Sequence, residues 1–453
     1  MKIHILGICG TFMGGLAILA REMGHEVSGT DANVYPPMSD FLRQHGIEIH
    51  EGYETAFVNG QYDLIIIGNT LSRGNPAVEY VLNESIPYRS GPQWLAENVL
   101  QQRKVIAIAG THGKTTTTSM AAWVLEQAGL SPGFLIGGIA ENFGTTARLG
   151  KSEYFVIEAD EYDTAFFDKR SKFIHYCPTI QVINNIEYDH ADIFGEIEDI
   201  FREFRRLVAI IPENGSIIYR GDDPNISSIL DAGCWSHTIP FCGVNTTWSY
   251  RPTRPDYSEF EILHNNRSAV LSWDLLGEHN ASNALAVAVI GDLVGIDIND
   301  VVQSLKSFKS VKRRLEILGE VSGIRVYDDF AHHPTAITTT LEALRAHVGE
   351  QRIIAVFEPR SNTMRLGVHS DTLGQSFCDA DLVYAFQPDG LNWDLAETFN
   401  QFPGRHEIHT SVTEIVTALQ TELCPGDNVV IMSNGGFGGI HQMILDALQN
   451  RPA

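Results

Sequence analysis

The feature of this chain that most restricts its fold is an apolar run that breaks into a glycine loop and then into a helical pattern. Residues 105–109 are Val-Ile-Ala-Ile-Ala, and the loop that follows reads Gly110, Thr111, His112, Gly113, Lys114, Thr115 and Thr116. The glycines let backbone amides approach an anion, and the helix after them presents the positive end of its dipole. Lys114 would add a full charge at the β- and γ-phosphates of a nucleotide, and the Thr115 hydroxyl would ligate Mg²⁺.

The loop is a short form of the phosphate-binding motif, because Ile108 stands where a strict P-loop has glycine. The alternative is an ordinary turn between a strand and a helix. Such a turn would explain the glycines but not the adjacent Lys-Thr-Thr, so the pattern predicts a phosphate-binding loop.

Length and charge restrict the classes of protein to consider. The 453 residues predict about three domains, at roughly 150 residues each. The net charge of -24 argues against general binding to nucleic acid or to an anionic membrane, since phosphates would be repelled. The six cysteines lack disulfide and metal spacing, which is typical of free thiols in a reducing cytoplasm. Residues 3–20 alternate as strand and then helix, so we expect neither an export signal nor a membrane span.

The N-terminal region is predicted to fold like a Rossmann unit. Residues 3–6 read as a strand, residues 13–23 as a helix, and residues 25–30 as a second strand that ends at Asp31. The glycine spacing is not that of a dinucleotide fingerprint, so another nucleotide, or a plain βαβ unit with a structural aspartate, remains open. A further strand at residues 63–67 would bring polar residues to the same edge. The candidate ligand contacts at this edge are Gly10, Thr11, Asp31, Asn69, Thr70 and Ser72.

Two apolar strands in the middle of the chain deliver polar residues beside the glycine loop. Residues 154–158 end at Glu158, and the strand that begins near residue 181 leads to His190. A carboxylate and an imidazole there suit Mg²⁺, and solvated strand ends are the alternative. Asn280 and Asn283 fall on one helix face, where their amides would pair with a base edge. From spacing alone, a helix cap is the better interpretation of these two residues.

A basic segment, Val-Lys-Arg-Arg at residues 311–314, precedes a third α/β region. It would be a solvated hinge, or it would supply a cation to the phosphates when the domains close. Beyond it, the loop at residues 358–365 carries Arg360 and Arg365, which fits recognition of substrate carboxylates. The glycine-rich loop at residues 433–439 fits a close approach of the backbone to a ligand.

These motifs, in their order along the chain, resemble those of the Mur ligase family. They are G-T-H-G-K-T-T, E-A-D-E, N-I-E-x-D-H, G-x-H-N-x-x-N, R-R and D-D-x-x-H-H-P, and they span essentially the whole chain. The resemblance implies an α/β fold with three domains. Residues 1–103 would form a Rossmann-like domain that binds a UDP sugar, residues 104–312 a central P-loop ATPase domain, and residues 313–453 a C-terminal Rossmann-like domain that binds the incoming peptide. It also implies ATP and Mg²⁺ as cofactors.

The opening residues and the loops at 358–365 and 433–441 resemble those of the family members that recycle cell-wall peptide. The resemblance implies a ligase that joins L-Ala-γ-D-Glu-meso-diaminopimelate to UDP-N-acetylmuramate through an acyl phosphate. The alternative within the family is a ligase that adds L-alanine to UDP-N-acetylmuramate, and the alternatives outside it are a P-loop kinase and a nucleotide-sugar sensor. We expect small-molecule partners only, in a cytoplasmic monomer or weak homodimer.

The resemblance also implies roles for individual residues. Lys114 and Thr115 would hold phosphates and Mg²⁺, and Glu158 and His190 would ligate a second Mg²⁺. Asn280 and Asn283 would face adenine, which replaces the helix-cap interpretation. Arg314 and Asp329 would complete the nucleotide site. The expected catalytic residues are Lys114, His190, Arg314 and Asp329, and the expected contacts to the sugar or peptide in the last domain are His332, Arg360, Asn362, Arg365 and Asn434.

The chain departs from the wider family at one point. Several members carry a carbamylated lysine on the helix after the magnesium-binding histidine, and residues 191–211 of this chain contain no lysine. We therefore expect no carbamylation here.

Overall fold

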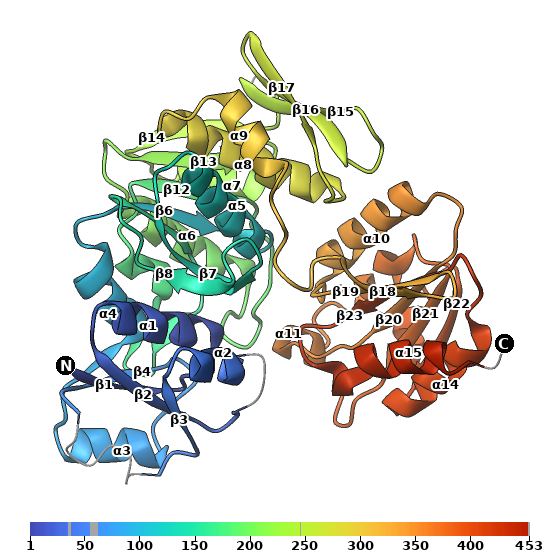
Figure 1. Ribbon diagram of the computed structural model, residues 1–453, viewed down its shortest axis with the longest axis horizontal. Helices are drawn as coiled ribbons and strands as arrows, with labels where there is room; N and C mark the ends of the chain where they lie inside the picture. The colour runs from blue at the N-terminus through green and yellow to red at the C-terminus, as the bar shows by residue number, and fades with distance from the viewer. Residues whose placement is uncertain (35–37, 55–61, 245, 452–453) are drawn as a thin grey trace.

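The chain folds into three α/β units, each built on its own β-sheet (Figure 1). The computed structural model describes residues 1–34, 38–54, 62–244 and 246–451. In Figure 1 the first unit lies below the central unit at the left, and the third unit lies beside them at the right. The α/β class and the three-part architecture predicted from the sequence are confirmed. The domain limits at residues 103 and 312 stay predictions.

The first unit is a parallel five-stranded sheet in the order β3-β2-β1-β4-β5. The strand order reverses between β1 and β4, which is where ligands bind in open sheets of this kind. The strands are β1 (Lys2–Leu6), β2 (Glu26–Asp31), β3 (Glu48–Glu51), β4 (Leu64–Ile67) and β5 (Tyr88–Ser90). The helices are α1 (Thr11–Glu22), α2 (Met38–Gln44), α3 (Pro76–Asn83), α4 (Gly91–Leu95) and the π-helical turn η2 (Ala96–Leu100).

The central unit is a ten-stranded sheet in the order β17-β16-β15-β14-β13-β12-β6-β9-β7-β8. Its middle is parallel, and its two ends are antiparallel at β15-β16-β17 and at β7-β8. The strands are β6 (Lys104–Ala109), β7 (Gly133–Ala140), β8 (Thr145–Arg148), β9 (Tyr154–Glu158), β12 (Ile180–Ile183), β13 (Ser216–Arg220), β14 (His237–Phe241), β15 (Trp248–Pro252), β16 (Glu259–His264) and β17 (Arg267–Ser272). A separate hairpin is formed by β10 (Asp163–Ala165) and β11 (Asp168–Ser171). The helices are α5 (Lys114–Gln127), η3 (Lys172–His175), α6 (Ile197–Ala209), α7 (Pro224–Asp231), α8 (Glu278–Leu293) and α9 (Ile298–Leu305).

The third unit is a six-stranded sheet in the order β18-β19-β23-β20-β21-β22, and only its edge strand β18 is antiparallel. The strands are β18 (Glu316–Val321), β19 (Ile324–Asp329), β20 (Ile353–Phe357), β21 (Leu382–Phe386), β22 (Arg405–His409) and β23 (Asn428–Met432). The helices are α10 (Pro334–Val348), α11 (Asn362–Arg365), α12 (Ser370–Leu373), η4 (Gly374–Phe377), α13 (Leu395–Phe399), α14 (Val412–Glu422), η5 (Phe437–Gly439) and α15 (Ile440–Gln449).

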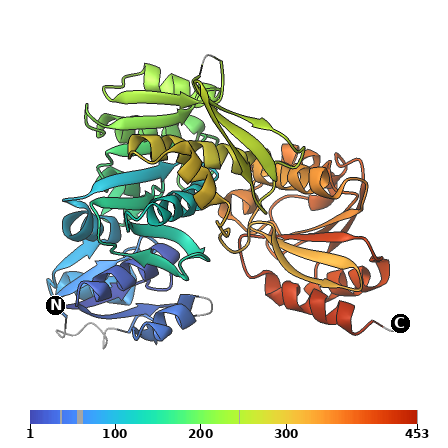
Figure 2. The ribbon, with the colours of Figure 1, turned by 45° about the horizontal axis from the view of Figure 1, so that its top comes forward.

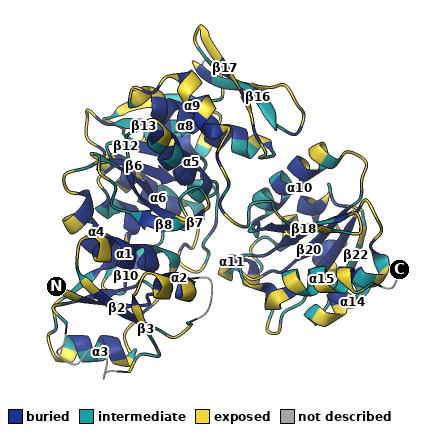
Figure 3. Ribbon diagram, viewed as in Figure 1, coloured by how far each residue is buried: buried dark blue, intermediate teal, exposed yellow. Residues whose placement is uncertain are grey.

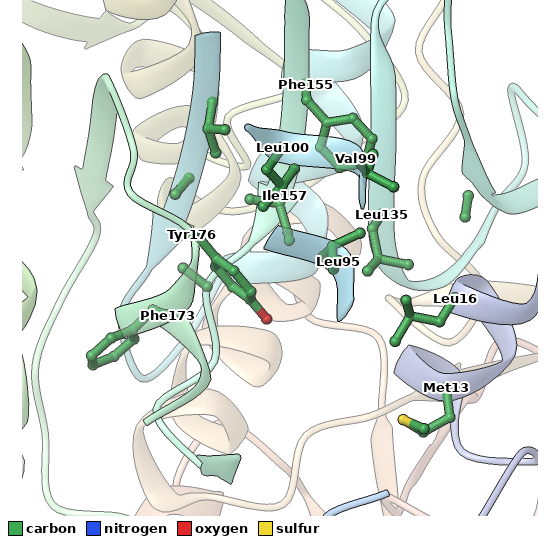
Figure 4. Packing of buried hydrophobic residues seen from close by; sticks show 14 of the residues in the cluster. Met13, Leu16, Leu95, Val99, Leu100, Leu135, Phe155, Ile157, Phe173 and Tyr176 are labelled. Atoms are coloured by element: carbon green, nitrogen blue, oxygen red, sulfur yellow. The ribbon is translucent and has the colours of Figure 1, made fainter. Parts of the chain in front are cut away.

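The first and central units share one apolar core. Figure 4 shows Leu16 of α1 next to Leu135 of the central sheet, with Met13 of α1 below them and Phe155 of the sheet above them. All four side chains belong to a single buried cluster. A Cβ atom on Gly15 of α1 would collide with the side chain of Leu135. Because this packing leaves no space between α1 and the sheet, the two units are held together as one body.

The third unit has its own core on each face of its sheet. Figure 3 shows its central strands buried beneath partly exposed helices. It meets the central unit through polar contacts instead. In Figure 2 the β15–β17 extension reaches toward the third unit, where Asp256 pairs with Nδ1 of His347 on α10 at 2.9 Å. A unit with a separate core and polar contacts is suited to move as a body over a site.

All six cysteines lie in the described part of the chain and carry free thiols. Within the described ranges, every helix falls short of the length and apolarity that crossing a bilayer requires.

Candidate active site

The predicted phosphate loop joins the end of β6 to the start of α5. Gly110 and Gly113 hold φ angles of +132° and +81°, which side chains disfavour. A Cβ atom on Gly113 would lie 2.7 Å from Oδ1 of Asn283, so space as well as conformation requires glycine there. Gly113 is the N-cap of α5 and makes no side-chain cap bond. The amides of the first turn of α5 are therefore free of a side-chain cap, as an anion site requires.

Lys114 lies against a buried carboxylate, Glu161, that was not among the predicted site residues. Its Nζ donates to the carbonyl oxygen of Gly110 at 2.6 Å and lies 3.1 Å from Oε2 of Glu161. On the other side of Glu161, Nε2 of His190 lies 3.0 Å from Oε1. The Glu161 side chain is 3% exposed and that of Lys114 is 12% exposed. One carboxylate thus joins two of the predicted catalytic residues.

The three groups stabilise one another in their charged forms. Burial opposes ionisation of Glu161, but Lys114 and the hydrogen bond from His190 hold the pKa of this carboxyl below its usual range. Burial also lowers the pKa of His190, and the bond to Glu161 outweighs this and raises it. His190 holds a φ of +57°, a left-handed conformation that is uncommon for a residue with a side chain. The backbone of His190 is therefore constrained so that its imidazole meets Glu161.

Glu158 and Thr115 form a second polar pair beside the loop. The Thr115 hydroxyl lies 3.1 and 3.0 Å from the two carboxylate oxygens of Glu158, and the amide of Gly137 donates to Oε2 at 2.9 Å. Burial raises the pKa of Glu158. A hydroxyl and a carboxylate next to a phosphate loop are the oxygen ligands that Mg²⁺ prefers, so these residues fit that ion. In the structure His190 contacts Glu161, and the ligation of a second Mg²⁺ by Glu158 and His190 stays a prediction.

A cavity of about 660 Å³ lies between the central and third units, next to the phosphate loop. This volume is within the usual range for small-molecule sites. The predicted site residues that line it are Thr111, His112, Gly113, Lys114, Thr115, Thr116, Glu158, His190, Asn280, Asn283, Arg314, Asp329 and His332. The structure therefore brings together residues that lie more than two hundred positions apart in the sequence.

Asn280 and Asn283 lie in the first turns of α8. The N-cap of this helix is Gly277, without a side-chain cap bond, so the helix-cap interpretation drawn from spacing alone is wrong. The Asn280 amide donates to the carbonyl oxygen of Leu276 at 2.8 Å, and Oδ1 of Asn283 accepts from Asn184 at 3.4 Å. Both side chains line the cavity, and the adenine contact stays a prediction.

The two arginines of the basic segment differ in their hydrogen bonds and in whether they line the cavity. Arg313 donates to Asp328 at 3.1 Å and to the carbonyl oxygen of Ser433 at 2.6 Å, which fastens the hinge to the third unit. Arg314 instead lines the cavity, with its guanidinium 5.3 Å from the ring centre of Phe330. Arg313 is therefore fixed by hydrogen bonds, and the role of Arg314 as a cation for the phosphates stays a prediction.

Asp329 and His332 lie at the end of β19 and in the loop after it. Asp329 accepts hydrogen bonds from the amides of Leu315 at 2.7 Å and Ala331 at 2.8 Å, and burial raises its pKa. These contacts make Asp329 a residue that positions the hinge against the cavity. Burial lowers the pKa of His332 to about 4, so its imidazole is neutral near pH 7.

The predicted contacts of the first unit gather at the carboxyl edge of its sheet, at the switch point between β1 and β4. Asp31 ends β2 and accepts from the amide of Cys9 at 2.9 Å, which ties it to the glycine turn after β1. Gly10 is the N-cap of α1, and Thr11 is the first residue of that helix. The remaining members of this set follow β4 and are Asn69, Thr70 and Ser72. The whole set lies outside the lining of the 660 Å³ cavity.

His332 lines the cavity, whereas the other predicted contacts of the third unit form a cluster outside that lining and are Arg360, Asn362, Arg365 and Asn434. Arg360 packs over Gly435, where a Cβ atom would collide with its guanidinium. Oδ1 of the neighbouring Asn434 is buried and has no hydrogen-bond partner among the described residues. Asn362 and Arg365 lie at the two ends of α11. The Asn362 amide donates to Asp192 of the central unit at 2.9 Å, so this cluster lies at the boundary between the units.

Sequence comparisons place the whole chain in one group of proteins. Three family profiles match it, described as the Mur ligase family catalytic domain at residues 2–103, the Mur ligase middle domain at residues 108–291, and the Mur ligase glutamate ligase domain at residues 313–435. The chain is 51% identical to the UDP-N-acetylmuramate–L-alanyl-γ-D-glutamyl-meso-2,6-diaminoheptandioate ligase of Escherichia coli K12, over 100% of this chain and 99% of that protein. It is 34% identical to the UDP-N-acetylmuramate–L-alanine ligase of Desulforamulus reducens, over 84% and 81%.

A solved structure agrees with these matches. The murein peptide ligase of Psychrobacter arcticus 273-4 is 43% identical and superposes with a TM-score of 0.77, and the match covers 100% of both chains.

Proposed function

Because this chain belongs to the Mur ligase family, we propose that it is an ATP-dependent ligase that joins L-Ala-γ-D-Glu-meso-diaminopimelate to UDP-N-acetylmuramate. The observation that carries the proposal is the 51% identity over the full length to an enzyme that is named for this reaction. The L-alanine-adding relative shares only 34% identity, which makes L-alanine addition the second candidate. The cavity between the central and third units supports both reactions, because each needs a nucleotide beside a closing domain.

The reaction has two steps. The lactyl carboxylate of the muramic acid attacks the γ-phosphorus of ATP, the new P–O bond forms as the bond to the β-phosphate oxygen breaks, and ADP leaves. The peptide amine then attacks the carbonyl carbon of the acyl phosphate, the C–O bond to phosphate breaks, and inorganic phosphate leaves as the nitrogen loses a proton. Orientation of the reacting groups can supply about 7–11 kcal/mol of such a barrier.

The residues of this chain neutralise and position the phosphates. The amides of residues 110–116 and the Lys114 ammonium would hold the β- and γ-phosphates, and Arg314 would reach them from the hinge side. Thr115 and Glu158 would hold Mg²⁺, which neutralises phosphate charge when bound. Glu161 keeps Lys114 and His190 charged and in place through contacts of 3.1 and 3.0 Å. An acyl phosphate hydrolyses in water, which gives the third unit a reason to close over the cavity.

The other two clusters suit the two organic substrates. The carboxyl edge of the first sheet, with Asp31 beside the glycine turn, would bind the UDP sugar. Arg360 and Arg365 of the third unit would pair with carboxylates of the peptide. The six free thiols fit the reducing cytoplasm as the place of the reaction. We expect the enzyme to work as a monomer or weak homodimer.

The test offers the purified protein ATP, Mg²⁺ and UDP-N-acetylmuramate together with either the tripeptide or L-alanine. We expect an amide-linked product and free phosphate with the tripeptide and little product with L-alanine, as measured by mass spectrometry and phosphate release. A strong preference for L-alanine would make the second candidate correct. ADP with a phosphorylated product and no free phosphate would indicate a kinase, and binding of the sugar without ATP turnover would indicate a sensor.

A further inference from the structure

Three potential metal ligands meet where the third unit touches the central unit. His112 lies in the phosphate loop, Glu187 follows β12, and His333 is the N-cap of α10. Among the described residues, these form the one group of three His, Cys, Asp or Glu side chains whose ligand atoms all lie within 4.8 Å of one another. We propose that His112, Glu187 and His333 bind one divalent transition-metal ion of the zinc class, at a site that bridges the two units and is separate from the Mg²⁺ ligands Thr115 and Glu158.

The distances between the ligand atoms suit such an ion. Oε2 of Glu187 lies 3.2 Å from Nε2 of His112 and 3.6 Å from Nδ1 of His333. In a tetrahedral zinc site with bonds of about 2.0–2.2 Å, neighbouring ligand atoms lie about 3.3–3.6 Å apart. The ring centres of the two histidines are 4.7 Å apart, so both imidazoles already face the same carboxylate. Small side-chain movements are enough to admit the ion.

The hydrogen bonds around His333 present the correct nitrogen to an ion. The amide of Thr335 can only donate, and it lies 3.3 Å from Nδ1 of His333, so this nitrogen carries a lone pair. The carbonyl oxygen of Tyr188 can only accept, and it lies 3.4 Å from Nε2, so that nitrogen carries the proton. A ligand histidine whose other ring nitrogen donates to a backbone carbonyl is the usual arrangement at metal sites. Nδ1 would exchange the Thr335 amide for the ion.

Glu187 is oriented as a ligand carboxylate should be. Its Oε2 accepts a hydrogen bond from the Thr335 hydroxyl at 2.7 Å, which fixes the group. Nε2 of His112 lies 3.2 Å from the same oxygen. Metal binding requires neutral imidazoles and an ionised carboxylate, so the His112 ring would release any proton on Nε2 when the ion binds.

The composition of the site distinguishes zinc-class ions from Mg²⁺. Two imidazoles and one carboxylate suit Zn²⁺ or Co²⁺, whereas Mg²⁺ prefers oxygen ligands. His369 is a candidate for the fourth position. Its ring centre lies 4.5 Å from that of His333, and its Nε2 is buried with no hydrogen-bond partner in the described part of the chain.

The experiment titrates ZnCl₂ into the full-length protein in excess Mg²⁺ by calorimetry, and repeats the titration with CoCl₂ followed by visible absorption. Excess Mg²⁺ occupies the oxygen ligands, so the signal reports a site that prefers nitrogen. We expect one Zn²⁺ per chain, with binding at least about tenfold weaker in Glu187→Gln and in His333→Asn. Asparagine is chosen at residue 333 because it also caps a helix.

His347→Asn is the matched control, because His347 pairs with Asp256 across the same boundary at 2.9 Å but lies outside the group of three. Its Zn²⁺ affinity should equal that of the unsubstituted protein. The proposal is overturned if the unsubstituted protein binds no stoichiometric Zn²⁺ in excess Mg²⁺, or if a folded Glu187→Gln or His333→Asn variant binds it equally well. Circular dichroism decides which variants are folded, and either one alone suffices for the test.

Discussion

Replacement of Lys114 by alanine tests the assignment of the phosphate site. The Lys114 ammonium is held at the start of α5 by Gly110 and Glu161, at 2.6 and 3.1 Å. A unit charge about 4 Å from a phosphoryl charge, at an effective dielectric constant of about 20, contributes about 4 kcal/mol. We therefore expect Lys114→Ala to lower kcat on the order of 10³-fold. The assay is phosphate release with ATP, Mg²⁺ and both co-substrates present.

The fold should survive the substitution. Removing one partner of a buried ion pair can cost about 3–5 kcal/mol when the other charge is left alone. Here Glu161 keeps His190 at 3.0 Å, so the loss in the free energy of unfolding should be smaller. The matched control is Lys104→Ala, since Lys104 begins β6 and pairs at the surface with Glu153 at 2.9 Å. A kcat of the Lys114 variant within tenfold of the control would refute the reasoning.

Three further predictions concern the arginines of the third unit, the Mg²⁺ ligand Glu158 and the buried His4. Arg360→Ala and Arg365→Ala should each raise the KM for the tripeptide about tenfold or more, because a charge-assisted hydrogen bond contributes about 1.5–3 kcal/mol. The KM for ATP should stay unchanged. An unchanged tripeptide KM in both variants would contradict this prediction. Glu158→Gln should raise the Mg²⁺ concentration for half-maximal activity about tenfold, as measured by a steady-state Mg²⁺ titration, because a ligand charge is removed; an unchanged Mg²⁺ dependence would exclude Glu158 as a ligand. Burial lowers the pKa of His4 to about 3. Below about pH 6.5 the unfolded chain therefore binds a proton at His4 that the folded chain does not bind. The free energy of unfolding should fall as the pH drops from about 6.5 to 3. At pH 5 this amounts to about 2 kcal/mol, and urea denaturation should show a smaller pH dependence by that amount in His4→Gln than in the unsubstituted protein; equal dependences would contradict it.

Much of the fold could be predicted because its parallel strands are short apolar runs that end in turn residues. The strand that ends at Asp31 and the helix that follows Gly113 are local patterns, and the structure has both. The antiparallel extension β15–β17 was not predicted, because its edge strand β17 is mostly exposed and its sequence carries little apolar signal. Residues 94–100 read as a short helix from the sequence, but that the turn η2 is π-helical was not predicted, because apolar periodicity does not indicate i→i+5 hydrogen bonds.

The candidate site was predicted as a set of motifs but not as a set of contacts. The sequence placed Glu158 and His190 near the phosphate loop, and the structure explains why, because β9 and β12 lie on either side of β6. It could not indicate that His190 pairs with Glu161, three residues beyond Glu158. The choice between two carboxylates on one loop depends on backbone angles after each strand, such as the φ of +57° at His190.

The sequence by itself determined the phosphate loop, the three α/β units and the family, because glycine requirements and apolar periodicity act over a few residues. Only the tertiary structure decided how the units meet. Glu187 reaches His333 across 146 positions, and Arg313 hydrogen-bonds to the third unit while the adjacent Arg314 lines the cavity. Such contacts depend on how separately folded bodies pack, and no local pattern in the chain encodes that placement.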